Sequence, residues 1–212
     1  MARTKIEWAH KVWNPVTGCT KISTGCLNCY AERYAKRFWG KRKFSDVQLH
    51  PDKLAEPLRW KNPLRVFVNS MSDLFHESIP FEYIVQVYNI MASASRHVFQ
   101  VLTKRPERAI KFYEYLRTLK DKDKGVWPHP NVWLGVSVEN QNTANARIPL
   151  LLRIPAALRF ISAEPLLGPI DLKVFQTGPL VDYSPPWLGE EAIKWVICGG
   201  ESGPAARLMH PD

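Results

Sequence analysis

The chain has 212 residues, of which 45% are apolar and 23% charged, a balance that favours a globular protein over a disordered one. No apolar run is long enough to span a membrane, and the first ten residues lack the apolar stretch of a secretory signal peptide. We therefore expect one domain over residues 1–212, in the cytoplasm, with no membrane partner. The net charge of +9 and the eight tryptophans are typical of one class of nucleic-acid-binding surface.

A weak first strand at residues 11–14 leads into the most informative feature, the cysteines Cys19, Cys26 and Cys29 in the spacing C-x6-C-x2-C. Disulfides are disfavoured because cytoplasmic thiols stay reduced. Clustered thiolates hold either zinc or an iron–sulfur cluster. Structural zinc needs a fourth ligand, and only one C-x-x-C pair is present. Three ligands favour an iron–sulfur cluster with one iron open to a ligand, and zinc is the alternative.

A basic, aromatic segment at residues 33–43 follows the cysteines and has the pattern of an amphipathic helix. Its cations either follow the phosphates of a nucleic acid or form a solvated helix face, and the sequence leaves both interpretations open.

From residue 65 onward, short β-branched or aromatic runs alternate with helical segments at the spacing of βα units. The predicted strands are 66–69, 98–102, 132–136, 158–161 and 195–198, and the predicted helices are 80–92, 106–116 and 142–153. Residues 168–191 contain Gly-Pro and Pro-Pro and predict a long irregular connection. This alternation favours a closed or partly closed α/β barrel, with a doubly wound open sheet as the alternative.

Polar residues follow the end of each predicted strand, where the loops of an α/β fold converge on one face. The candidates for holding a ligand are Ser70, Asp73, Lys104, Ser137, Glu139, Glu164 and Glu201. Lys104 suits a carboxylate or phosphate. Asp73 and Glu139 have an alternative role as helix caps. Cys198, within an apolar strand, is expected to be a small buried hydrophobe.

The chain resembles a family of phages and bacteria named for phage gene products thirty-seven and sixty-eight, which are three-cysteine proteins. The matching stretches are 6–8, 13–19, 25–32, 102–106, 133–137, 162–165 and 199–203, which together cover nearly the whole chain. That family is similar in turn to radical S-adenosylmethionine (SAM) enzymes.

The resemblance implies a partial (β/α)6 TIM-like barrel in which Cys19, Cys26 and Cys29 hold a [4Fe-4S] cluster. Its open iron would bind the amino and carboxylate groups of SAM. One-electron reduction, from an electron-donor protein, would then cleave SAM to a 5′-deoxyadenosyl radical that abstracts hydrogen from substrate. The seven polar residues would hold SAM or substrate, with Lys104 the candidate for a carboxylate.

Two features differ from the common radical-SAM pattern. Six residues rather than three separate the first two cysteines, and Asn69–Asp73 stands where a Gly-Gly-Glu element usually follows strand two. The resemblance also implies one further helix and strand, so we expect a C-terminally truncated chain. The sequence thus predicts a radical-SAM-like enzyme of phage or mobile-element context, acting on an unidentified substrate for which nucleic acid is a candidate. The alternative is a zinc- or iron–sulfur-stabilised nucleic-acid-binding protein without catalysis.

Overall fold

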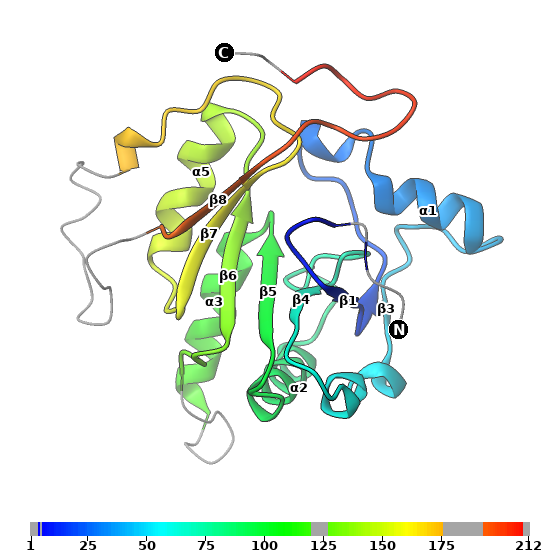
Figure 1. Ribbon diagram of the computed structural model, residues 1–212, viewed down its shortest axis with the longest axis vertical. Coiled ribbons are helices and arrows are strands. Elements are labelled where there is room, and N and C mark those ends of the chain that lie inside the picture. The colour runs from blue at the N-terminus through cyan, green and yellow to red at the C-terminus, as the bar shows by residue number, and fades with distance from the viewer. Residues whose placement is uncertain (1–3, 5, 120–126, 176–192, 210–212) are drawn as a thin grey trace.

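The computed structural model describes residues 4, 6–119, 127–175 and 193–209, which fold around a six-stranded parallel sheet (Figure 1). The six strands follow one another across the sheet in chain order, without the reversal of a doubly wound sheet. They are β1 (Lys11–Trp13), β4 (Arg65–Val68), β5 (Val98–Thr103), β6 (Val132–Ser137), β7 (Leu158–Ala163) and β8 (Trp195–Cys198). The predicted α/β class and the predicted strand positions are confirmed.

Three crossover helices cover one face of the sheet (Figure 1), namely α2 (Phe81–Ser93), α3 (Pro106–Thr118) and α5 (Gln141–Leu152). α3 starts with Pro106, which is tolerated because the first turn of a helix needs no backbone N–H donor. Asn140 caps α5 by accepting a hydrogen bond from the Thr143 N–H at 3.0 Å. Tyr88, Phe112 and Ile148 from these helices are fully buried in the core against the strands. All three predicted helices are confirmed.

The chain between β1 and β4 forms a separate layer at the edge of the sheet. It contains the antiparallel pair β2 (Val16–Thr17) and β3 (Gln48–Leu49), and the helix α1 (Tyr30–Phe38). Short 3-10 helices occupy the remainder: η1 (Thr24–Cys26), η2 (Pro51–Lys53) and η3 (Glu56–Arg59). The predicted helix over residues 33–43 is correct only as far as Phe38. It ends there because Gly40 takes the left-handed conformation, with φ +61°, that commonly terminates a helix.

The predicted irregular connection at residues 168–191 is described only in part. It contains the 3-10 helix η4 (Lys173–Phe175), and residues 176–191 lie outside the described residues.

The sheet is strongly curved, and Trp8 lies on its concave face. The Trp8 ring centroid lies 4.7 Å from that of Phe67 on β4 and 6.2 Å from that of Trp195 on β8. The Phe67 and Trp195 rings therefore lie no more than about 11 Å apart. In a flat sheet, strands four spacings apart would be separated by roughly 19 Å. β4 and β8 must bend toward Trp8, although within the described residues β1 and β8 do not pair and the sheet stays open.

A glycine on β6 makes room for this aromatic cluster. Phe160 on β7 packs against Trp195, with ring centroids 5.6 Å apart, and its ring lies over Gly135 of β6. A Cβ at position 135 would lie 2.6 Å from the Phe160 ring, closer than atoms tolerate. The packing of this curved sheet thus depends on Gly135, which leaves room for the Phe160 ring.

No helix in the described part of the chain is both long enough and apolar enough to cross a membrane.

Replacing Gly135 with Ala should lower the free energy of unfolding by about 1–3 kcal/mol, because the added methyl group displaces the buried Phe160 ring. Urea denaturation measures this change. Gly168→Ala is the matched control, since its Cβ would meet only Asn140 Cβ at 3.5 Å. Equal stability of the two variants would contradict the packing described.

Candidate functional site

The cysteine loop (residues 18–29) starts beside the end of β4. The Gly18 N–H donates to the Met71 carbonyl at 2.9 Å, and Ser72 Oγ donates to the Gly18 carbonyl at 2.7 Å. Gly18 has φ +94°, and a Cβ there would lie 2.6 Å from the Asp46 carbonyl oxygen, so only glycine fits this turn. The turn places Cys19 at the carboxyl edge of the sheet.

Cys19, Cys26 and Cys29 are all free thiols and partly buried. Burial, reinforced by the charge of Asp73, raises the pKa of Cys19 to about 11. Burial also opposes ionisation of Cys26, but backbone hydrogen bonds at Ile22 and the Lys104 charge outweigh it and lower its pKa. Within residues 4, 6–119, 127–175 and 193–209, no three His, Cys, Asp or Glu side chains are gathered as a metal site.

Asp73 links the ends of two strands to the cysteine loop. Its carboxylate accepts hydrogen bonds from Thr103 Oγ1 at 2.8 Å and from the Lys104 N–H at 2.9 Å, both at the end of β5. Arg105 Nη1 donates to Asp73 Oδ2 at 3.3 Å and to Cys19 Sγ at 3.5 Å. Because Asp73 and Arg105 are 6% and 4% exposed, this buried ion pair fixes the position of Cys19.

Arg105 also holds the next residue of the loop. Its Nη2 donates to the Thr20 carbonyl and to Thr20 Oγ1, both at 3.0 Å. His76 Nε2 lies 2.9 Å from the same Thr20 Oγ1. Cys19 and Thr20 therefore have a defined orientation relative to the ends of β4 and β5.

Glu139, just beyond β6, joins the middle of the cysteine loop to the fold. Ser23 Oγ donates to Glu139 Oε1 at 2.8 Å, and Arg147 Nη1 on α5 lies 3.1 Å from Oε2. A Cβ at Gly25 would lie 2.4 Å from Glu139 Cγ, so the loop passes directly over this fully buried carboxylate. Glu139 therefore lies directly beneath the part of the cysteine loop that carries Cys26.

The Lys104 side chain extends toward Glu139 and is 20% exposed. Its Nζ donates to Ser137 Oγ at 2.6 Å and lies 3.6 Å from Glu139 Oε1. Ser137 Oγ donates in turn to the Glu164 carbonyl at 3.1 Å. Lys104 is thus a cation held between buried oxygens, on a side chain that is 20% exposed.

Glu164 lies at the end of β7, where Ser162 Oγ donates to its Oε2 at 2.9 Å. Its Oε1 would lie 2.8 Å from a Cβ at position 199, so Gly199 at the end of β8 leaves room for the carboxylate. Its partial exposure leaves it accessible to a ligand.

Glu201 closes the far end of the cysteine loop. Asn28 Nδ2 donates to Glu201 Oε2 at 2.8 Å, and Arg207 binds both carboxylate oxygens through Nη2 and Nε. Arg207 Nη2 also donates to the Thr24 carbonyl at 2.9 Å. The hydrogen bonds from Arg207 lower the pKa of Glu201 to about 2. The segment after β8 therefore lies across the cysteine loop as a clasp.

Ser70 lies beside the same end of the cysteine loop, where α1 begins. Its Oγ donates to Asn14 Oδ1 at 3.2 Å, and its carbonyl accepts a hydrogen bond from Tyr30 Oη at 2.5 Å. Tyr30 is the first residue of α1, so this contact ties the end of the cysteine loop to β4.

The structure brings all seven predicted polar residues to the carboxyl edge of the sheet, but in different roles. Asp73, Ser137 and Glu139 are buried and hold the loop and Lys104. The Glu201 side chain is only 5% exposed and is occupied by Arg207 and Asn28. Ser70, Lys104 and Glu164 keep some exposure. Neither alternative helix-capping role holds: Asp73 bonds Phe75 N–H in a turn, and Asn140 rather than Glu139 caps α5.

Sequence reasoning missed three residues that support the site, namely Asn28, Arg147 and Arg207. Arg147 had a usable signal, because it lies on the same helix face as the buried Ala144 and Leu151, where a cation requires a partner. Asn28 and Arg207 had none, since they meet only through the folding of distant segments.

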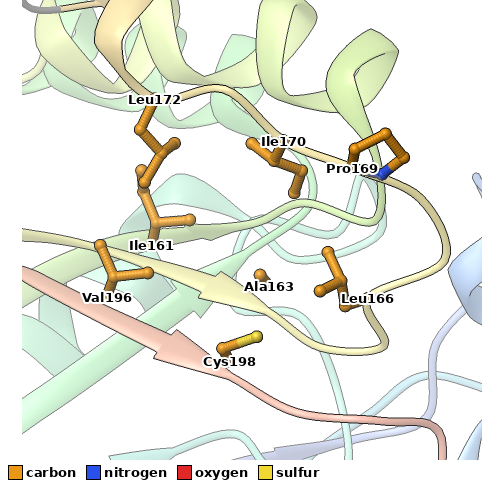
Figure 2. A pocket seen from close by; sticks show the side chains of 8 residues that line it. All are labelled: Ile161, Ala163, Leu166, Pro169, Ile170, Leu172, Val196 and Cys198. Atoms are coloured by element: carbon orange, nitrogen blue, oxygen red, sulfur yellow. The ribbon is translucent and has the colours of Figure 1, made fainter. Parts of the chain in front are cut away.

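The expectation that Cys198 is buried was wrong, because its residue is exposed. β8 is an edge strand, and Cys198 and Val196 project from the face opposite the Trp195 ring. They line an apolar pocket of about 180 Å³ together with Ile161 and Ala163 (Figure 2). The pocket contains none of the seven polar residues.

The site as a whole offers three thiols from one loop, the partly exposed Lys104 side chain and the partly exposed Glu164 carboxylate. Thiols bind soft metals, and the Lys104 ammonium suits a carboxylate or phosphate. A family model described as "Protein of unknown function (DUF5131)" matches residues 3–212.

The chain belongs to this DUF5131 family. No curated protein and no solved structure matches the chain.

Asp73→Asn should lower the free energy of unfolding by about 3–5 kcal/mol, because it leaves the buried Arg105 cation without its main partner. Glu77→Gln is the matched control. Glu77 also pairs with Arg105, at 3.2 Å, but its side chain is 65% exposed, and its loss should cost less than about 1 kcal/mol. Chemical denaturation measures the free energy of unfolding of both variants. Similar losses in the two would contradict this account.

The Glu201–Arg207 clasp should weaken in acid. The carboxylate titrates near 4.5 when free and at about 2 in the fold, so its stabilisation is complete above about pH 5 and is lost as the pH falls toward 2. The stability difference between the natural chain and Glu201→Gln, measured by denaturation from pH 7 to pH 2, should shrink over that window. In an Arg207→Ala background the pH dependence should disappear, and its persistence there would exclude Arg207 as the cause.

Proposed function

We propose that this protein is a radical-SAM-like iron–sulfur enzyme whose curved sheet is a partial six-stranded barrel. The observation that carries the proposal is the course of the cysteine loop. The loop is hydrogen-bonded to three strand ends: Gly18 to the residues after β4, Ser23 to Glu139 after β6, and Asn28 to Glu201 after β8. The three thiols are thus held at the edge where α/β folds place their chemistry.

The residues present fit an iron–sulfur cluster in the kind of donor they offer. Three thiols lie in one loop, none is engaged in a disulfide, and their partial burial limits access of solvent. Lys21 and Lys104 lie close enough to Cys26 to act on it electrostatically, which would compensate the negative charge of a thiolate-bound cluster. Because the sulfurs are not gathered as a metal site, binding would rearrange these side chains.

Cys19, Cys26 and Cys29 would hold the [4Fe-4S] cluster. Such a cluster, when bound, would supply one electron from a donor protein for the cleavage of SAM to methionine and a 5′-deoxyadenosyl radical, which becomes 5′-deoxyadenosine on taking a hydrogen atom from the substrate.

The protein's own residues would hold SAM and exclude water. Lys104 would bind a carboxylate, because Ser137 and Glu139 fix its ammonium and its side chain remains 20% exposed. Glu164 and Ser70, both partly exposed, would accept hydrogen bonds from the amino or ribose groups of a ligand. Arg105 would position Cys19 and Thr20 without touching the substrate.

Anaerobically purified and reconstituted protein should be brown and contain iron and sulfide. With SAM and a reductant it should release 5′-deoxyadenosine. Cys19→Ala, Cys26→Ala and Cys29→Ala should each lose iron, because three ligands are the fewest that hold such a cluster with one iron open. Cys198→Ala is the matched control and should keep it, since Cys198 lines an apolar pocket that contains no residue of the cysteine loop.

A second candidate is a metal-stabilised nucleic-acid-binding protein without catalysis. It is favoured by the exposed basic and aromatic residues of α1 and by the structural bonds that tie down the cysteine loop. A colourless protein that carries one tightly bound zinc and releases no 5′-deoxyadenosine would favour this candidate and exclude the first.

A further inference from the structure

One side of α1 exposes three aromatic rings. Tyr30, Tyr34 and Phe38, here called the α1 ridge, are spaced four residues apart and so lie on one side of the helix. They are 47%, 52% and 57% exposed. α1 lies away from the helices that cover the sheet (Figure 1). Large rings that remain this exposed on one side of a helix indicate a contact surface.

α1 turns small residues toward the protein and large aromatic residues toward solvent, which is the reverse of the usual amphipathic helix. Its only buried residues are Ala31 and Ala35, whose small side chains let the helix backbone lie close to the rest of the protein. Burying an aromatic side chain typically stabilises a protein by about 1.5–3 kcal/mol, so a helix that buries alanine and exposes three rings forgoes this gain. We therefore expect the exposed rings of the ridge to contact a ligand.

The charge around the ridge identifies what kind of ligand fits. Residues 33–43 contain no acidic residue, and their cations are Arg33, Lys36, Arg37, Lys41, Arg42 and Lys43. The nearest acid, Glu32, is already paired with Lys21 at 2.8 Å and with Lys36 at 3.0 Å. Such a dense positive segment is complementary to a polyanion and would disfavour an apolar or basic partner.

We propose that the α1 ridge binds single-stranded nucleic acid, with bases stacked on its rings and phosphates paired with the cations of residues 33–43. Unpaired bases expose the faces that stack on aromatic side chains, whereas a duplex conceals them. The inference rests on the proposed function and names the substrate class of the same site.

Ring geometry defines how bases would stack. The Tyr34 and Phe38 ring centroids are 4.5 Å apart. A base inserted between two rings needs about 7 Å, twice the 3.4 Å stacking distance, so bases must stack on the outer faces. Arg37 lies over the Phe38 ring at 5.1 Å, where its guanidinium can pair with a phosphate next to a base stacked on Tyr34.

The ridge leads directly to the candidate site. α1 begins immediately after Cys29, and Tyr30 Oη donates to the Ser70 carbonyl at the end of β4. At the next turn, Arg33 donates to the Ser202 carbonyl in the clasp after β8. A strand held along α1 would therefore reach the space beside the cysteine loop and Lys104, where an unpaired base could be presented.

Fluorescence anisotropy with a labelled 20-nucleotide single strand of mixed sequence tests the inference, with the matching duplex as competitor. Tyr34→Ala combined with Phe38→Ala should weaken single-strand binding about tenfold or more. The natural chain should prefer the single strand to the duplex. The control variant Leu58→Ala with Val174→Ala removes two other exposed apolar side chains, which are 42% and 48% exposed, and should bind like the natural chain.

The salt dependence of affinity tests the cations separately. Arg37→Ala combined with Lys41→Ala should reduce the slope of log affinity against log salt by roughly 1.4, because each lost phosphate contact to a single strand contributes about 0.7. Lys111→Ala with Arg117→Ala on α3 makes the same change in charge at another exposed position and should leave the slope unaltered.

Three outcomes would overturn the inference: no binding of the single strand, equal binding by the ridge variant, or preference for the duplex. A ridge variant that changes only the oligomeric state, measured by sedimentation, would instead assign the ridge to a protein contact. Iron, sulfide and 5′-deoxyadenosine are measured on the same variants. Because the ridge variant should keep its iron and sulfide, loss of nucleic-acid binding without loss of the cluster separates this inference from the proposed function.

Discussion

The contact of one tryptophan with two distant strands sets the geometry on which the candidate site depends. Trp8 touches Phe67 on β4 and Trp195 on β8, and strands four spacings apart can share one ring only if the sheet bends. Bending brings the carboxyl ends of the strands toward one another. The short cysteine loop can then bond to residues after β4, β6 and β8 at once. In a flat sheet the same three contacts would be spread over roughly 19 Å, and the loop would have to extend to make them.

Charge in this site is divided between buried and accessible groups. Asp73 with Arg105, and Glu139 with Arg147, are ion pairs that solvent barely reaches, and their bonds orient Cys19, Thr20 and Ser23. Lys104 and Glu164 rest on these pairs and remain partly exposed. Removing a buried partner should therefore disturb the fold, whereas replacing an accessible group should alter ligand binding first.

The strand and helix positions could be predicted from the sequence because each element depends on local properties. Alternation of β-branched runs with helical segments placed β4 to β8, and proline at the start of α3 marked a helix boundary. The strand-end polar residues were also predictable, since parallel strands end on one edge. Cys198 was predicted incorrectly because burial at an edge strand depends on what packs against it. The helix over residues 33–43 was predicted too long because Gly40 adopts a left-handed conformation that the helical pattern does not reveal.

By itself, the sequence determined a parallel α/β fold, a three-thiol loop after the first strand and a cationic segment that follows this loop in the chain. These features follow from periodicity, spacing and composition, which are properties of neighbouring residues. Only the tertiary structure decided that Arg105 orients Cys19, that Glu139 lies under Gly25 and that Arg207 closes the loop through Glu201. It also decided that α1 buries its alanines and exposes its aromatic rings. Each of these contacts joins segments far apart in the chain, and their distances depend on how strongly the sheet curves.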